Sequence, residues 1–185
     1  MTALGAGLTV LLLVVAVLAN WGASFASDSL KSQLTAQEIE MPAGTDVNQE
    51  DPADVIAYFE SRAGEMMSTG KDAQMYADYY IGFHMAHMPT YAVASAENRA
   101  AAAALAADPT NADLKADAAA KAATVETVFK GNMLRGTLLT AYAFGTLGDI
   151  AGYAAMASLI GALLMFVLTL AGVAHLRRTD DSATI

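Results

Sequence analysis

The sequence predicts an all-α membrane protein with two transmembrane helices and an extracytoplasmic helical bundle between them. Residues 3–26 and 150–174 contain no charged side chain, and each stretch is long enough to cross a bilayer as a helix. The polar middle of the chain carries apolar residues at helical spacing, which predicts the bundle. Apolar residues make up 55% of the 185 residues, a high share for a soluble protein.

These segments divide the chain into five regions. The first span has an alternative interpretation, because "ASFAS" resembles a signal-peptidase site with cleavage after Ala26. An uncleaved anchor is favoured, since the opening residues lack Lys and Arg and the apolar stretch is long for a leader. We expect a transmembrane helix over 1–26, a linker over 27–51, an extracytoplasmic helical domain over 52–135, a long helix including the second span over 136–176, and a cytoplasmic tail over 177–185.

The orientation follows from the basic residues beside the second span. Arg177 and Arg178 come directly after it, and basic residues near span ends concentrate on the cytoplasmic side. We therefore expect a plasma-membrane protein with both termini cytoplasmic and residues 27–135 extracytoplasmic. That outer region holds sixteen acidic and eight basic residues, a net charge of −8. Such a surface excludes nucleic acid as a partner.

Four helices are expected after the linker, which itself has one short strand or helical turn around Ile39. Asp51 and Pro52 supply an N-cap and a first helical residue. Thr110 with Asp113 resembles a capping box, and no proline follows, so the last helix can run into the second span. From Gly136 onward it exceeds the bilayer thickness, so the surplus must pack on protein. The expected helices cover residues 52–67, 72–88, 90–107 and 110–176.

The stretch "FHMAHM" offers a candidate metal site. His84 and His87 share one helix face, and Met85 and Met88 lie on an adjacent stripe. Imidazole and thioether ligands outside the cytoplasm suit Cu(I). The alternative interpretation is ordinary packing, because methionines fill core gaps and two histidines do not complete a ligand set. Three further methionines could add ligands if the first two helices pair: Met66, Met67 and Met75.

No catalytic motif is present. "GEMMSTGK" departs from a phosphate loop in the spacing of its glycines, and Asp72 stands where Ser or Thr is required. The sequence contains neither G-x-S-x-G nor H-E-x-x-H. It also has no cysteine, which excludes disulfides, thiolate nucleophiles and covalently attached c-type haem. We expect a protein that is not an enzyme and holds no cofactor, with copper as the alternative.

Small residues in the second span form candidate helix-packing sites. Gly148 and Gly152 make a G-x-x-x-G, and Ala157 with Gly161 repeats the spacing, which allows helices to approach closely in lipid. The alternative is the general abundance of Gly and Ala in membrane helices.

Two charged residues lie near the outer edge of the second span. Arg135 and Asp149 are fourteen residues apart, close to four helical turns, so both point the same way. They are too far apart along the axis to touch. We expect each to need a partner on another helix.

Two stretches carry a resemblance to a known family. "STGKDAQMYADYY" at 68–80 and "GNMLRGTLLTAYAFG" at 131–145 are similar to elements of actinobacterial two-span proteins labelled "aromatic ring-opening dioxygenase LigA". The chain departs from that pattern in its alanine-rich segment around 95–122 and in "FHMAHM". The resemblance implies an actinobacterial envelope protein, but not the labelled activity, because a lone His pair is all that could ligate an iron.

Together these observations predict a non-catalytic accessory or scaffold subunit of a larger membrane complex. Respiratory and transport complexes both fit as hosts. The expected partners are other membrane protein subunits or further copies of the chain, within the lipid bilayer. The alternative function is extracytoplasmic copper binding through His84, His87, Met85 and Met88.

Overall fold

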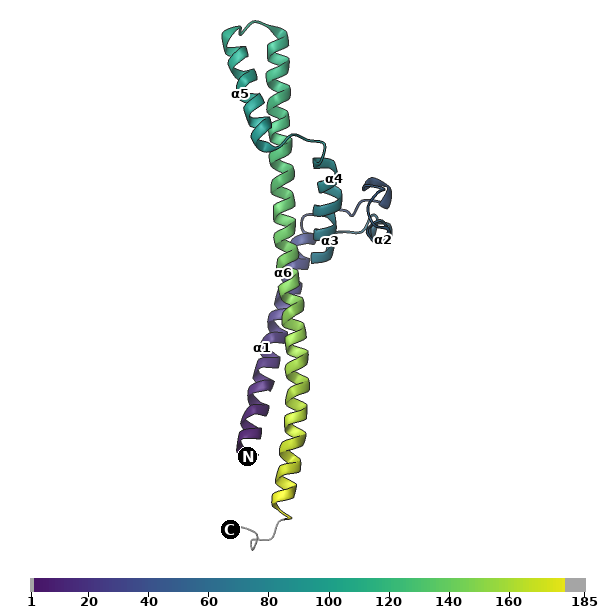
Figure 1. The fold of residues 1–185 in the computed structure, drawn as a ribbon, viewed down its shortest axis with the longest axis vertical. Coiled ribbons are helices and arrows are strands. Elements are labelled where there is room, and N and C mark those ends of the chain that lie inside the picture. The colour runs from purple at the N-terminus through teal and green to yellow at the C-terminus, as the bar shows by residue number, and fades with distance from the viewer. Residues whose placement is uncertain (1, 179–185) are drawn as a thin grey trace. The chain divides into compact units, whose positions relative to one another are not determined.

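The computed structural model describes residues 2–178, and these residues form helices joined by short loops (Figure 1). They divide into two compact units. The span unit comprises residues 1–31 and 144–185, and the middle unit comprises residues 32–143. The last seven residues of the expected cytoplasmic tail, 179–185, lie outside the described residues. The elements are α1 (Thr2–Thr35), the 3-10 helix η1 (Gly44–Asp46), α2 (Ala53–Arg62), α3 (Gly70–Met75), the π-helix η2 (Tyr76–Ile81), α4 (Gly82–Met85), α5 (Tyr91–Ala107) and α6 (Ala112–Leu176).

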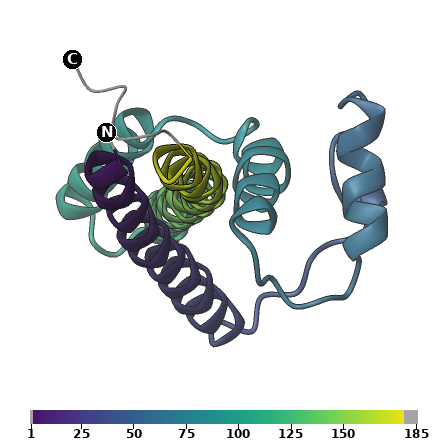
Figure 2. The same cartoon turned by 90° about the horizontal axis from the view of Figure 1, so that it is seen from below.

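In the span unit, α1 and the C-terminal half of α6 lie side by side and run in opposite directions (Figure 1 and Figure 2). The α6 residues Gly148, Ala155 and Ala162 are buried and recur every seven residues. That interval matches the 3.5-residue spacing of a coiled-coil seam. Four glycines show the antiparallel register, because their neighbours on the other helix are close: Gly5 with Thr169, Gly161 with Leu12, Gly152 with Ala23, and Gly148 with Ala26.

The outward faces of the same two helices are apolar and exposed. Both helices are long and apolar enough to cross a membrane. At one end, exposed aromatic rings gather at a common level of the pair: Trp21 and Phe25 on α1, and Tyr153 on α6. Arg177 and Arg178 follow α6 at the other end. Aromatic rings at one boundary and basic residues at the other are typical of membrane-spanning segments.

The linker expected over residues 27–51 is wrong at its start. α1 continues through the polar residues to Thr35, and Leu34 is buried. The stretch from Ser27 to Thr35 contains no glycine or proline and includes good helix formers, so nothing ends the helix there. Glu38, with φ 52°, then turns the chain in the left-handed region.

An isolated antiparallel bridge joins Glu40 to Met66, near the position expected for a short strand or turn. The Met41 N–H donates to the Glu65 carbonyl at 2.8 Å, and the Met67 N–H donates to Ile39 at 2.8 Å. The expected helix over 52–67 is therefore wrong at its end. α2 ends at Arg62, because Gly64 adopts a positive φ of 73° that favours glycine and reverses the chain.

The core of the middle unit forms around this bridge. Met41, Phe59 and Met67 are almost completely buried there. η1 packs on α2, and a side chain at Gly44 would place its Cβ 3.1 Å from the Ile56 carbonyl oxygen. The expected cap of α2 is displaced by one residue, since Pro52 rather than Asp51 occupies the N-cap position.

The last two helices follow the expectation closely. α5 begins after Thr90, whose hydroxyl accepts a hydrogen bond from the Val93 N–H, and it ends before Pro109. α6 runs without a break for 65 residues, as predicted. Its cap is Asn111 rather than Thr110, because the Asn111 side-chain oxygen accepts from the N–H groups of the next turn at 3.0 and 3.2 Å.

The surplus length of α6 is covered on part of its circumference within the middle unit. Lys121 pairs with Glu97 of α5 at 2.7 Å, and Val128 and Leu138 are buried. Within this unit, three large apolar residues of α6 stay exposed: Phe129, Met133 and Leu134. The described helices therefore flank α6 without enclosing it.

Candidate functional site

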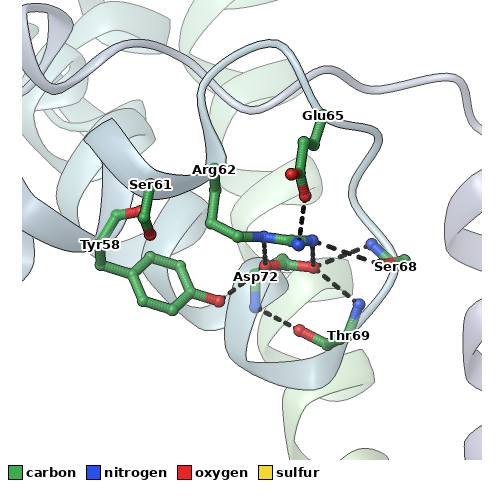
Figure 3. A network of polar contacts seen from close by, with 7 residues as sticks. All are labelled: Tyr58, Ser61, Arg62, Glu65, Ser68, Thr69 and Asp72. Carbon is green, nitrogen blue, oxygen red and sulfur yellow. Dashed lines mark hydrogen bonds and ion pairs between the residues drawn. The ribbon is translucent and has the colours of Figure 1, made fainter.

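A polar network centred on Asp72 holds the loop between α2 and α3 (Figure 3). The Asp72 carboxylate accepts hydrogen bonds from the Tyr58 hydroxyl at 2.6 Å and from Arg62 at 2.9 and 3.1 Å. It also accepts from the backbone N–H groups of Ser68 at 3.0 Å and Thr69 at 2.9 Å. The Thr69 hydroxyl accepts from the Asp72 N–H at 3.0 Å, which completes a capping box at the start of α3.

The electrostatics of this network favour an ionised Asp72 beside a neutral Tyr58. Burial opposes ionisation of Asp72, but the hydrogen bonds from Tyr58, Ser68 and Arg62 outweigh it and lower the pKa of the carboxyl. Burial, followed by the hydrogen bond and the negative charge of Asp72, raises the pKa of Tyr58 to about 12. Asp72 is 0% exposed, and no buried side-chain nitrogen or oxygen among the described residues lacks a partner. The network therefore fixes the loop between α2 and α3.

Sequence reasoning missed this network, although a signal was present. "TGKD" at 69–72 has the spacing of a capping box, and it lies inside the stretch 68–80 that resembles the two-span family. Asp72 stands where a phosphate loop requires Ser or Thr, and so it excludes that motif. The same residue holds the loop between α2 and α3 through its hydrogen bonds.

The helix expected over residues 72–88 is interrupted by a π-helical segment. η2 spans Tyr76–Ile81, and the Gly82 N–H donates to the Ala77 carbonyl five residues earlier. The following α4 ends at Met85, a turn before Pro89, which cannot continue the ladder. Wide π turns of this kind are frequent at functional sites.

Five aromatic side chains form a continuous row along η2 and α4, which we call the ring ridge. Its members are Tyr76, Tyr80, Phe83, His84 and His87. Ring centroids are 4.8 Å apart for Tyr76 and Tyr80, and 4.6 Å for Tyr80 and His84. Phe83 packs edge-on against His84 at 5.4 Å and against His87 at 5.9 Å. Both histidines are exposed, and the other three rings are half-buried.

Another side of η2 and α4 packs on α6. Asp78 pairs with Arg135 of α6 at 3.1 Å, and the Met85 sulfur lies against Gly131, where any Cβ would collide with it. Asp78 and Met85 therefore lie on the side of this helix that contacts α6, and the adjacent His84 lies about a quarter turn away from Met85. The contacts to α6 account for the positions of Asp78 and Met85, and the two exposed rings of the ridge are those of His84 and His87.

The candidate metal ligands divide between these two faces. His84 and His87 belong to the ring ridge, and His84 Nδ1 donates to the Tyr80 carbonyl at 2.8 Å. Met85 faces α6, and Met88 is half-buried in the turn before Pro89. Among residues 2–178, no three His, Asp or Glu side chains gather as a metal site. Copper binding by His84, His87, Met85 and Met88 stays a prediction.

The predicted packing glycines lie on the seam between α1 and α6. Gly148, Gly152 and Gly161 each have a neighbour from α1 within 4 Å. Ala157 is exposed, outside this seam, because it lies five residues after Gly152 and so points to another side of the helix.

The two edge charges have different surroundings. Arg135, in the middle unit, has its partner in Asp78. Asp149, in the span unit, is exposed, and its carboxylate makes no ion pair with any residue that the structure describes.

Comparison with protein-family models, with curated proteins and with solved structures found no match to this chain. The resemblance to the two-span family therefore stays a prediction, and the geometry of the chain itself carries the functional argument.

Proposed function

We propose that the protein is a non-catalytic integral membrane subunit that docks on another protein through the ring ridge. The observation that carries this proposal is the unbroken row of five rings along η2 and α4, with both of its histidines exposed. In this role the chain is an accessory or scaffold component of a larger membrane complex, with its helical middle region outside the cytoplasm.

The composition of the ring ridge supports docking rather than ordinary surface solvation. Tyrosine is enriched among the residues that contribute most to protein–protein binding. Its ring supplies apolar contact area at little cost in conformational entropy, and its hydroxyl can remain hydrated or find a partner. The rings of the ridge already pack on one another, so little further ordering is required when a partner binds.

The span unit fits the role of an anchor. Its small-residue seam is occupied within the chain by the pairing of α1 with α6, and its outer faces are apolar. The predicted packing residues Gly148 and Gly152 are therefore not free to bind a separate subunit. Ala157, on the exposed side, remains available for contact with a further helix or a second copy.

The proposed topology places both termini in the cytoplasm, because Arg177 and Arg178 adjoin the second span. A topology reporter inserted near Asn98 tests this directly. Activity of an exported-only reporter supports the extracytoplasmic position of the ring ridge. Activity of a cytoplasm-only reporter at that site would place it inside and remove the envelope role.

The docking proposal is tested by extraction in mild detergent followed by native mass measurement. We expect the wild-type chain to extract with a second protein, and the double variant Tyr80→Ala, Phe83→Ala to extract alone. Phe129→Ala is the matched control, because Phe129 is an exposed ring on α6, 51% accessible, two residues from Gly131 and thus on nearly the opposite side of that helix. A monodisperse wild-type monomer, or equal loss in the control, would contradict docking through the ridge.

A further inference from the structure

We infer that the protein docked on the ring ridge presents a positively charged surface around an apolar centre. This inference rests on the proposed docking function and adds the chemistry of the partner. It follows from the distribution of charge in the middle unit, to which the ridge belongs.

The charge asymmetry lies in the segment before and within α2. Residues 32–61 contain seven acidic side chains and no Lys, Arg or His. Six of the seven are exposed, and Asp51 is half-buried. The seven are Glu38, Glu40, Asp46, Glu50, Asp51, Asp54 and Glu60.

This negative charge is not neutralised within the described chain. None of the seven carboxylates forms an ion pair with any residue between 2 and 178. Half of the eight basic residues in the outer region are already paired with other acids: Arg62 with Glu65 and Asp72, Lys121 with Glu97, Lys130 with Glu126, and Arg135 with Asp78. The negative charge of residues 32–61, which we call the acidic segment, is therefore available to attract a positively charged partner.

The acidic segment is fixed to the helix that bears the ring ridge. Tyr58 and Arg62 of α2 bond to Asp72 of α3, and α3 continues without a loop into η2 and α4. The rings and the carboxylates therefore belong to one hydrogen-bonded part of the middle unit, so a partner docked on the rings also experiences the negative charge. Complementary charge steers such an encounter and suppresses wrong partners.

Charge complementarity also distinguishes between the possible partners of the ring ridge. A second copy of this chain would bring two regions of net −8 together, which like-charge repulsion opposes. An anionic membrane surface is disfavoured for the same reason. A basic protein surface gains from both features, because arginine binds carboxylates and also stacks on the faces of tyrosine and phenylalanine rings.

The test places a photo-crosslinking benzoylphenylalanine at Phe83, and separately at the exposed His87, in the full chain in native membranes. Attached peptides are identified by mass spectrometry, and the net charge of the contacted segment is read from its sequence. We expect a protein segment rich in Lys and Arg. We also expect the crosslink yield to fall as NaCl is raised well above about 0.1 M, where the Debye length shrinks below about 10 Å.

A pair of charge variants makes the test sharper. Asp54→Asn with Glu60→Gln removes two charges of the acidic segment, and we expect the yield at moderate salt to fall by about fivefold. Asp113→Asn with Asp117→Asn removes two exposed charges from the start of α6 and serves as the matched control, with no loss expected.

The possible failures are distinguishable. A neutral or acidic contacted segment, or a yield independent of salt and of both variants, overturns the inference and leaves docking in place. Attachment to a second copy of the chain also overturns it. Attachment to lipid alone, at both positions, overturns the inference and the docking function together.

Discussion

The span unit and the middle unit bury different kinds of side chain. Apart from Leu30, the buried residues of the span unit are small, with Ala16, Gly148 and Ala162 among them. The polar Thr9 bonds to a carbonyl of its own helix at 2.8 Å. The middle unit instead buries large side chains such as Phe59, together with the ionised Asp72.

The difference fits the proposed surroundings of each region, lipid for the span unit and water for the middle unit. In lipid the hydrophobic effect does not drive helices together, so close approach of backbones and van der Waals packing must hold them. In water, apolar burial supplies the main driving force, and a buried carboxylate is tolerated only when its hydrogen bonds are complete. We therefore expect the span unit to be sensitive to larger side chains in its seam, and the middle unit to be sensitive to loss of the Asp72 carboxylate.

The largest effect is expected from Asp72→Ala. The substitution leaves Arg62, Tyr58 and two backbone N–H groups without their acceptor, and removing one partner of a buried pair costs about 3–5 kcal/mol. Arg62 is partly exposed, which favours the lower end. The loss of stability is measured by thermal unfolding of the middle unit, monitored by circular dichroism of the protein in nanodiscs.

The control for that prediction is Asp78→Ala, which also removes a carboxylate bound to an arginine. The pair of Asp78 with Arg135 is exposed, so its loss should cost at most about 1 kcal/mol. If the two variants lowered the free energy of unfolding equally, the burial of Asp72 would not explain its contribution to stability.

A smaller effect is expected from Gly148→Leu in the span unit. A Cβ at Gly148 already lies 3.0 Å from the Ala26 Cβ, so a longer side chain must push α1 and α6 apart at a cost of about 1–3 kcal/mol. The chain has no native cysteine, so disulfide formation between cysteines introduced at Ala23 and Gly152 reports the separation.

Gly7→Leu provides the matched control on α1. An added Cβ at Gly7 meets nothing within 4 Å, and we expect the crosslink between the introduced cysteines to form as in the parent. If Gly148→Leu also leaves the crosslink unchanged, the small-residue seam does not hold the two spans together.

Alkaline and acidic pH should loosen the middle unit and spare the spans. The native pKa of Tyr58 is raised from 10.0 to about 12, so its contribution is complete below about pH 10 and is lost as pH rises toward 12. The native pKa of Asp72 is lowered, so its contribution is present above the unfolded value near 4 and is lost as pH falls below it.

Ultraviolet titration of the tyrosines measures the alkaline effect. One tyrosine should ionise about two pH units late, and Tyr58→Phe should remove that late step. Hydrogen exchange at high pH should show opening around α3 before any change in the spans, whose residues 3–26 and 150–174 carry no charged group. Simultaneous opening of both regions would contradict the separation.

The smallest effect is expected from Cu(I) added to the whole protein. Met85 faces α6 rather than the histidines, and two imidazoles leave the ligand set incomplete, so we expect no saturable binding. Saturable binding that is lost in His84→Ala with His87→Ala would establish the copper alternative.

The sequence by itself determined the elements whose causes are local. Two uncharged stretches of sufficient length predicted two helices able to span a membrane, and the absence of proline after Pro109 predicted that α6 runs unbroken. Thr90 and Pro109 bound α5 as expected. These features depend on backbone propensity and on side chains within one turn of each other, so they can be read along the chain.

The tertiary structure alone decided which side of each helix is used. Gly148 and Ala157 look alike in sequence, but only Gly148 meets α1, because the register of the antiparallel pair selects one stripe. The "FHMAHM" residues look like one cluster, but packing against Gly131 turns Met85 away from His84 and His87. Asp72 can bond to Tyr58 and Arg62 because the chain reverses at Gly64 and brings α3 back beside α2. Contacts between residues far apart in sequence depend on how helices pair, which spacing along one helix does not contain.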